Sequence, residues 1–345
     1  MDYTRQTIYS DPRHHRQRLA ALPDDPAGIA AVVRNLVVHY RASGLEFPPD
    51  RLAEIDSRWV DRMLDADASR FTEPLEAPRP AEQRIVGCCR DFTLLTVAAL
   101  RAKGIPARSR VGFADYFEPG FHIDHVVTEY QDGNRWILLD SQLDPAGDPN
   151  LVAGSVAGFG SGAGSVAGSG RGPGLVPGSG LDVTDLPLGP GGFRSAAQSW
   201  LAFRCDGEDP ETFGVAPGHP IRGSRMICGQ LLTELAHRRG DELLLWDVWG
   251  LAADFSAELA RRPPEEAWSD LPPWEPGELA VIDEIAEMLL AADSGDRAAE
   301  SKLAARYAED PGLHPGDVIT CYSPRGVVSD VDLRRRSVSV DGGAP

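Results

Sequence analysis

The sequence predicts an α+β fold, in which a buried helix and a β-hairpin form the centre and helices lie toward both ends. Apolar residues cover almost every face of residues 92–103, which is typical of a helix buried on most sides. Residues 125–130 and 135–140 are rich in β-branched, aromatic and aliphatic residues and flank a turn signal. Apolar stripes with helical period lie in residues 1–80 and recur in residues 182–345.

Residues 1–80 are predicted to be helical. Asp25 and Pro26 supply an N-terminal cap and a first-turn proline for one helix. A second helix is expected after residues 48–50 (Pro-Pro-Asp). The first helix is predicted to bury Ile29, Val32, Val33, Leu36 and Tyr40, and the second Leu52, Ile55, Trp59 and Met63.

The central helix places a cysteine at its start. Gly104 stands where a C-terminal cap belongs, and Pro106 prevents continuation of the helix. Cys89 therefore lies at or just before the first turn, where unpaired N–H groups and the helix dipole stabilise a thiolate. With a histidine partner, such a cysteine can have its pKa lowered from roughly 8.5 to between about 3.5 and 7.5. The same N–H groups are suited to binding an oxyanion.

The hairpin brings a histidine and a carboxylate together. If residues 131–134 (Gln-Asp-Gly-Asn) form the loop, Tyr130 pairs with Arg135, and His125 then stands opposite Asp140. Directly opposed residues point to the same face, with Cβ atoms about 4.5–5.5 Å apart. The register therefore predicts a carboxylate that orients an imidazole, and a slip of one residue would separate them.

These motifs resemble the transglutaminase-like superfamily, relatives of the papain-like cysteine proteases. They are Gly87-x-Cys89-Arg90-Asp91-Phe92, Gly104-Ile105-Pro106-Ala107-Arg108, Asp124-His125, and Trp136 ahead of Leu139-Asp140. The resemblance implies a core in which the active-site helix packs on an antiparallel sheet, with helical N- and C-terminal elaborations. It implies Cys89 as nucleophile, His125 as base and Asp140 as orienting acid.

Three segments outside the core motifs resemble a bacterial single-chain branch of the superfamily. The segments concerned are Ser10-Asp11-Pro12, Thr72-Glu73-Pro74 and Leu245-Trp246-Asp247-Val248-Trp249-Gly250. Two positions depart from that branch: Cys88 stands where a small polar residue such as Asn is usual, and Val126 stands where Trp is frequent.

Other residues near the motifs have competing interpretations. His122 competes with His125 for the base, and His125 is favoured because it alone meets the carboxylate across the hairpin. Cys88 is expected to be a passive neighbour rather than a resolving thiol, since adjacent cysteines seldom bridge. Asp124 and Asp144 are interpreted as solvated loop acids, with a minor substrate contact as the alternative.

Two charged residues follow the cysteine directly. Arg90 is expected to make an ion pair or lie at the surface, with contact to a substrate carboxylate as the alternative. Asp91 is expected as an ordinary first-turn helix residue.

No cofactor or metal is expected. Cys88, Cys89, His122 and His125 offer soft ligands, but adjacent cysteines lack the spacing of ordinary zinc sites. Neither a calcium loop nor a phosphate-binding glycine loop matches the sequence.

Composition narrows the class of partner. The net charge is −18, from 52 acidic and 34 basic residues, which disfavours nucleic acid or an anionic membrane as main partner. The N-terminal residues do not resemble a secretory signal, and no apolar run approaches the roughly 18 residues of a membrane span. Five cysteines without a spaced framework fit a reducing compartment, so we expect a cytoplasmic protein.

The sequence divides into four regions. They are an N-terminal helical region (1–80), a transglutaminase-like catalytic core (81–150), a flexible insertion rich in Gly, Ser and Ala (151–181), and a mainly helical C-terminal region (182–345). Helices in the last region are expected at about 222–238, 241–250, 276–292 and 297–309. The predicted function is cysteine-dependent acyl transfer on a small-molecule or peptide amide, and the alternative is a non-catalytic binding or scaffold protein on the same fold.

Overall fold

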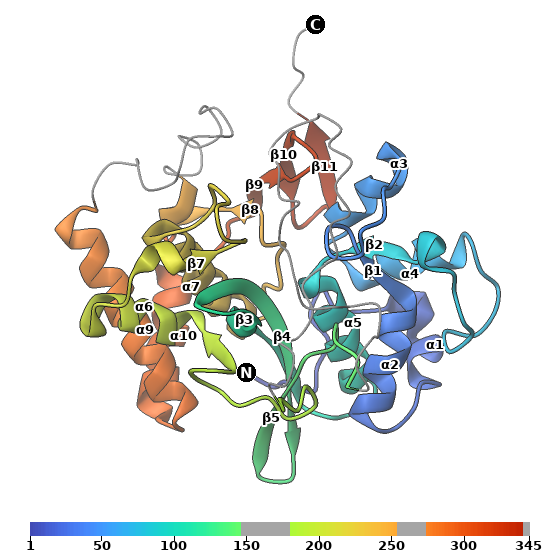
Figure 1. Ribbon diagram of the computed structural model, residues 1–345, viewed down its shortest axis with the longest axis horizontal. Coiled ribbons are helices and arrows are strands. Elements are labelled where there is room, and N and C mark those ends of the chain that lie inside the picture. The colour runs from blue at the N-terminus through green and yellow to red at the C-terminus, as the bar shows by residue number, and fades with distance from the viewer. Residues whose placement is uncertain (146–179, 254–273, 341–345) are drawn as a thin grey trace, which may run out of the picture.

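The computed structural model describes residues 1–145, 180–253 and 274–340. These residues form an α+β fold in which a central antiparallel sheet lies between N-terminal helices and C-terminal helices (Figure 1). Apart from its last two residues, the insertion predicted at 151–181 falls outside the described residues.

Strands from two parts of the chain build the central sheet. Its order is β5-β4-β3-β6, and β7 pairs in parallel with β4 at His122 and Ile123. The strands are β3 (Ala107–Glu118), β4 (Phe121–Asp132), β5 (Arg135–Leu139), β6 (Phe193–Ser195) and β7 (Phe213–Gly214). Because β6 and β7 come from the C-terminal region, that region contributes directly to the sheet that carries the predicted site.

The hairpin register differs from the predicted one. Tyr130 pairs with Ile137 rather than with Arg135, which pairs with Asp132. The loop is therefore the two residues Gly133 and Asn134, and Gly133 has a φ of 56°, which suits glycine in a tight hairpin turn. The predicted register is wrong by two residues, an even number, so every side chain keeps its predicted face.

The helix that carries Cys89 has the predicted extent. Helix α5 (Cys89–Ala102) ends before Gly104, whose φ of 75° only glycine adopts readily. It packs against β4 on one side and α2 (Pro26–Leu36) on the other (Figure 1), so it is buried along its length. This burial explains why apolar residues occupy nearly all its faces.

The N-terminal region is only partly as predicted. Asp25 caps α2 by accepting from the Gly28 N–H at 2.6 Å, as expected. That helix ends at Leu36, so Tyr40 does not lie on it. Instead, β1 (Val37–His39) pairs in parallel with β2 (Ile85–Gly87).

The second predicted helix is wrong as a continuous element. It is divided into α3 (Pro49–Leu52), the 3₁₀ helix η2 (Ala53–Asp56) and α4 (Val60–Ala68). The break occurs beside Arg58, whose side chain makes a buried ion pair with Asp247. The remaining short helices of residues 1–88 are η1 (Arg13–His15), α1 (Arg16–Ala20) and η3 (Ala81–Gln83).

Three of the four predicted C-terminal helices are present, as α7 (Ser224–Arg239), α9 (Pro276–Asp293) and α10 (Arg297–Glu309). The prediction for 241–250 is wrong, because that segment is irregular, with a turn at residues 245–246 followed by β8 (Asp247–Val248). The described part of this region also contains α6 (Ala196–Leu201), the π-helical turn η4 (Ala202–Asp206), η5 (Pro210–Thr212) and η6 (Gly250–Ala252).

A second antiparallel sheet, not predicted from the sequence, lies near the C-terminus. Its order is β11-β10-β9-β8. The strands are β9 (Val318–Ser323), β10 (Val327–Asp332) and β11 (Ser337–Val340), and β8 joins them at Cys321. This sheet stands apart from the central one (Figure 1).

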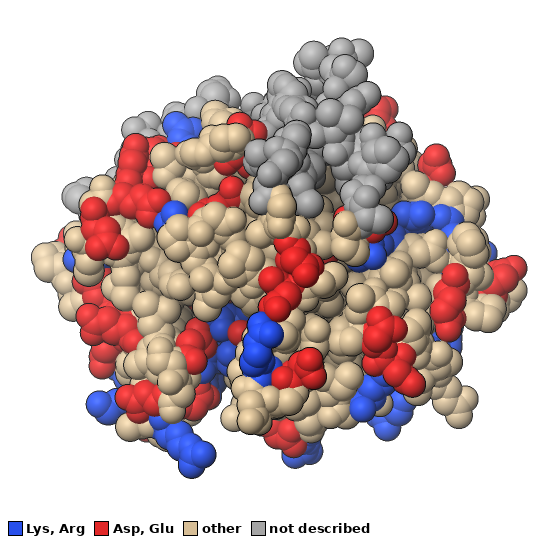
Figure 2. Space-filling model, turned by 60° about the horizontal axis from the view of Figure 1, so that its bottom comes forward, with Lys and Arg blue, Asp and Glu red and all other residues tan. Residues whose placement is uncertain are grey.

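The helices differ in length and polarity from membrane-spanning ones. Within residues 1–145, 180–253 and 274–340, every helix is too short or too polar to cross a membrane. On the face shown in Figure 2, acidic and basic side chains are scattered among uncharged ones.

Candidate active site

Cys89 is the first residue of α5, and its position is fixed by the turn around it. The Cys88 N–H donates to Asp91 Oδ2 at 2.8 Å, so Asp91 closes the first turn as expected. Arg90 is buried and pairs with Asp91 at 3.0 Å, which confirms the ion-pairing role over a surface one. Arg90 also donates to the Arg58 carbonyl at 2.6 Å and thereby ties the helix start to the N-terminal region.

His125 and Asp140 meet as the hairpin argument required. His125 Nε2 lies 2.8 Å from Asp140 Oδ2. Continuing the observed register places Asp140 opposite Val127, one position along the same face from His125. The contact is thus diagonal rather than directly across the hairpin, and the register error did not separate the two residues.

Tyr116 contacts the carboxylate of the site, a role that was not predicted from the sequence. Its hydroxyl donates to Asp140 Oδ2 at 2.8 Å, and the Gln142 N–H donates to Oδ1 at 2.9 Å. Tyr116 reaches this point because β3 departs from its regular register between Ala114 and Glu118. Burial favours the neutral carboxyl, but the charge and hydrogen bond of His125, together with these donors, lower the pKa of Asp140.

The edge of β4 next to His125 is occupied by α5. The ladder between β4 and β5 ends at Thr128 and Leu139, which leaves the backbone of Val126 without a strand partner on that side. The Val126 carbonyl instead accepts from Thr93 Oγ1 at 2.9 Å, and its N–H donates to the Cys89 sulfur. The helix start is therefore held against the strand beside His125.

The pKa shifts of Cys89 and His125 have opposite directions. A hydrogen bond from the Cys88 thiol, then hydrogen bonding and charge from His125, outweigh burial and lower the pKa of Cys89 to about 5. Burial disfavours the charged imidazole, but Asp140 and Cys89 raise the pKa of His125 to about 10. Between these values the stable form is a thiolate beside an imidazolium.

Both ring nitrogens of His125 have partners in this arrangement. Nε2 faces Asp140, so Nδ1 is the nitrogen left for the hydrogen bond to Cys89. The three side chains are 5% (Cys89), 3% (His125) and 1% (Asp140) exposed, and the Phe117 ring meets the His125 ring edge-on at 5.0 Å. Little water therefore screens the pair.

Four further side chains border the cysteine. Tyr40, Leu245 and Trp246 pack against the cluster that contains Cys88 and Cys89. Asp124 is half-buried in β4, not in a loop. Burial and the charge of Cys89 raise the pKa of Asp124 to about 7. Asp144 is exposed.

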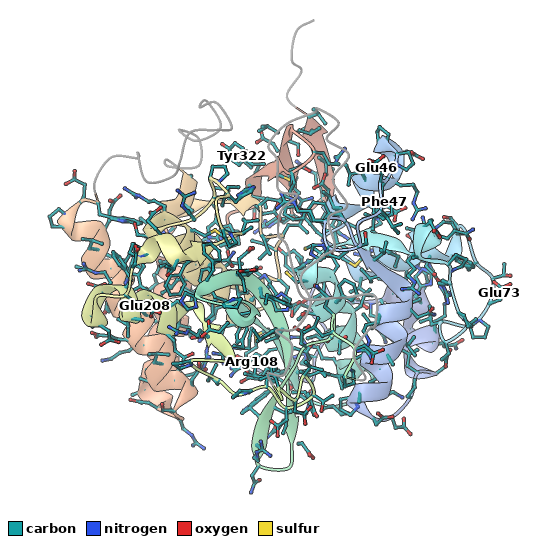
Figure 3. All side chains as sticks on the ribbon, in the orientation of Figure 1. Glu46, Phe47, Glu73, Arg108, Glu208 and Tyr322 are labelled. Carbon is teal, nitrogen blue, oxygen red and sulfur yellow. The ribbon has the colours of Figure 1, made fainter. Side chains whose placement is uncertain are left out.

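His122 belongs to a different cluster from that of Cys89, His125 and Asp140. Its Nδ1 lies 2.6 Å from Asp115 and its Nε2 lies 3.1 Å from Glu208. Arg194 pairs with both of these carboxylates, and the imidazole stacks on Phe213 at 4.1 Å. Glu208 lies on the side of the sheet where α6 packs (Figure 3).

One group of side chains in the described part of the chain has metal-ligating composition. His14, His15 and Asp65 bring their ligand atoms within 4.8 Å of one another. Both imidazoles lie beside the same oxygen, Asp65 Oδ1, at 3.0 and 2.9 Å. Hydrogen bonding between η1 and α4 accounts for this arrangement.

Part of the chain matches a known protein family. Residues 51–141 match the sequence model of the transglutaminase-like superfamily. A solved structure from Cytophaga hutchinsonii, described as a candidate cysteine protease, is 19% identical over 41% of this chain, with a TM-score of 0.27. The match spans 40% of that protein's length, and at this TM-score the similarity carries no argument here. No curated protein matches the chain. The segment of this chain that matches the transglutaminase-like model contains Cys89, His125 and Asp140.

Proposed function

We propose that this protein is an enzyme that transfers an acyl group through a thioester at Cys89. The observation that supports this most directly is the buried chain of contacts from Cys89 through His125 to Asp140, with opposite pKa shifts in the first two residues. Opposite shifts in neighbouring groups support Cys89 as the nucleophile and His125 as the acid–base residue.

The proposed reaction begins with the thiolate. Cys89 Sγ attacks the carbonyl carbon of an amide, and the electrons of the carbonyl double bond move to its oxygen. The His125 imidazolium gives its proton to the leaving amine as the tetrahedral intermediate collapses to the thioester. His125, now neutral, takes a proton from the second nucleophile, and Asp140 holds the ring orientation through both steps.

The second nucleophile is either water or an amine. Water gives an amidase or peptidase, and an amine gives an amide-forming acyltransferase. The proposed substrate is a small-molecule or peptide amide rather than nucleic acid, because a net charge of −18 repels polyanions. We propose that the enzyme is cytoplasmic, because the reducing cytoplasm keeps cysteine thiols from forming disulfides. The alternative is a non-catalytic binding protein on the same fold. An unreactive Cys89 would favour this alternative.

The pH profile of Cys89 alkylation tests the proposal. Iodoacetamide labelling, mapped by peptide mass spectrometry, should have its midpoint near the Cys89 pKa of about 5 in the unsubstituted protein. The sign follows from the pair: the thiolate is lost as pH falls through about 5, and the imidazolium partner is lost as pH rises through about 10. His125→Ala should move the midpoint upward, toward about 8.5.

The exposed Cys205 provides an internal reference in the same digest. Its labelling should not respond to His125→Ala, whereas that of Cys89 should. A midpoint for Cys89 near about 8.5 in both proteins would mean an ordinary thiol and would favour the binding protein.

A further inference from the structure

His39 is a histidine beside the proposed site that the reaction above does not use. It is the last residue of β1 and stands in register with Gly87 of β2, two residues before Cys89. The Tyr40 N–H donates to the Gly87 carbonyl at 2.9 Å and fastens this segment to the chain that enters α5. The Tyr40 ring, stacked on the His39 ring at 5.3 Å, packs against the cluster that contains Cys89.

The backbone fixes the tautomer of His39. Its Nδ1 lies 3.1 Å from the Arg41 nitrogen and 3.0 Å from the Ala42 nitrogen, and both backbone N–H groups donate to it. A nitrogen that accepts carries no proton, so the neutral ring holds its proton on Nε2. Burial, followed by the positive charges of Arg41 and His125, lowers the pKa of His39 to about 3. The ring therefore remains a neutral donor throughout the range in which Cys89 is a thiolate.

The Nε2–H of His39 donates to no atom of residues 1–145, 180–253 and 274–340, and the residue is half-buried. The buried His237 shows the contrast, because its Nδ1 bonds to Ser109 and its Nε2 to the Leu243 carbonyl. A half-buried donor that is held in one tautomer and has no partner among these residues is available to an acceptor from outside the chain, either water or a bound substrate.

We propose that the His39 Nε2–H, together with the Cys89 backbone N–H, forms the oxyanion hole of this site. The inference rests on the proposed acyl transfer at Cys89. When the thiolate adds to the carbonyl carbon, the oxygen gains the electron pair of the broken π bond, and His39 donates a hydrogen bond to it without giving up its proton. A neutral imidazole suits this role, since an imidazolium would compete with His125 for the thiolate.

Two reactions of Cys89 distinguish this role from a structural one. Acylation by p-nitrophenyl acetate passes through an oxyanion, whereas alkylation by iodoacetamide displaces iodide and forms none. Removing one oxyanion-hole donor lowers acyl-transfer rates by about 10²–10³-fold in other enzymes. His39→Ala should therefore slow p-nitrophenolate release at pH 7 by roughly 10²-fold. Its effect on the rate of Cys89 alkylation should stay within about twofold.

Two further variants keep the test clear of folding effects. His39→Gln retains a carbonyl that can accept the two backbone N–H groups and an amide that can donate, so it should recover part of the acylation rate. His14→Ala removes an exposed histidine that has no part in the proposed site and should leave both rates unchanged. Circular dichroism and thermal unfolding should show that each variant is folded.

The outcomes separate the inference from the proposed function. If acylation and alkylation fall together in His39→Ala, the residue positions the cysteine and does not bind an oxyanion. If neither rate falls, His39 has no part in the reaction. If Tyr40→Phe slows acylation and His39→Ala does not, the donor is Tyr40 and the inference is overturned. If the unsubstituted protein shows no fast alkylation of Cys89 at pH 7, the proposed function fails and this inference fails with it.

Discussion

Strand β4 carries two buried charged clusters on one face, four residues apart. They differ in whether their cation can release a proton. His125 stands opposite Gly112, and Glu129 stands opposite Arg108. Because side chains alternate along a strand, both residues point to the same side of the sheet. Glu129 pairs with Arg108 and also lies 3.3 Å from Arg110.

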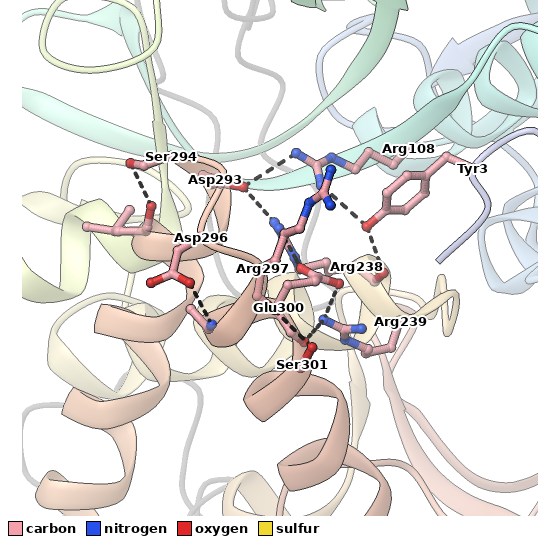
Figure 4. Close-up of polar contacts among 12 residues, drawn as sticks. Tyr3, Arg108, Arg238, Arg239, Asp293, Ser294, Asp296, Arg297, Glu300 and Ser301 are labelled. Atoms are coloured by element: carbon pink, nitrogen blue, oxygen red, sulfur yellow. Dashed lines mark hydrogen bonds and ion pairs between the residues drawn. The ribbon is translucent and has the colours of Figure 1, made fainter.

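The cluster around Glu129 has fixed charges. Asp293 joins it from α9 and lies 2.6 Å from Arg110. Asp293 also pairs with Arg238 at 2.6 Å, and Figure 4 shows it between Arg108 and Arg238. Burial opposes ionisation of Asp293 and Glu129, but the guanidinium charges prevail and lower the pKa of each. Guanidinium groups do not release protons at accessible pH. This cluster also lines a cavity of about 510 Å³, yet it contains no nucleophile.

The cluster around His125 has the same burial and the opposite property. Its cation is an imidazolium that can give a proton away, and its anion, Cys89, is a nucleophile once deprotonated. Burial and charge pairing thus occur at both places, and the chemical identity of the cation separates a structural ion network from a candidate catalytic one. Substitutions in each cluster test whether the two differ in this way.

The largest effect on stability is expected from the fixed cluster. Glu129→Gln leaves Arg108 and Arg110 buried with one compensating charge fewer, which should cost about 3–5 kcal/mol of unfolding free energy. Urea unfolding measures this, with Arg135→Gln as the matched control. The exposed pair of Arg135 and Asp185, whose side chains are 68% and 43% exposed, should contribute about 0–1 kcal/mol.

The same variant tests whether the two clusters are independent. Under conditions in which Glu129→Gln remains folded, the midpoint pH of Cys89 alkylation should equal that of the unsubstituted protein. A displaced midpoint would show that the charges around Glu129 help to set the Cys89 pKa, and the comparison drawn above would not hold.

A smaller effect is expected at Asp140. Asp140→Ala removes the carboxylate that orients His125 and stabilises its charged form, so it should raise the midpoint pH of Cys89 alkylation by about one pKa unit. At about pH 4, below the midpoint, this shift should slow alkylation by about tenfold. Tyr116→Phe deletes one hydrogen bond to the same oxygen and should have a weaker effect in the same direction. Equal rates in Asp140→Ala and the unsubstituted protein would remove Asp140 from the site.

The candidate residues could be predicted from the sequence because their signals are local. A helix that begins at Cys89 and a hairpin that joins His125 to Asp140 each depend on residues close in the chain. The register was wrong because Gly133 fits a loop of two residues as well as a loop of four. His125 and Asp140 still lie on the same side of the sheet, because a shift of two residues does not change the side to which each side chain points.

The supporting residues could not be predicted, because their positions depend on long-range pairing. Tyr116 reaches Asp140 through an irregularity in β3 that leaves no sequence signal. His39 lies in a strand of three residues directly after a helix, and that strand exists because β2, far along the chain, pairs with it. A continuous apolar stripe through residues 29–40 favoured a longer helix instead.

The smallest expected effect tests whether Cys88 is passive, as the sequence suggested. The Cys88 thiol donates a hydrogen bond to Cys89, the largest single contribution to the lowered pKa of the nucleophile, and its own pKa is raised accordingly. Cys88→Ala should raise the alkylation midpoint of Cys89 by about one pKa unit or less, the value of one net hydrogen bond. Cys88→Ser should keep the midpoint low because a hydroxyl also donates. An unchanged midpoint in Cys88→Ala would mean that His125 and the helix start set the thiolate without help from the neighbouring cysteine.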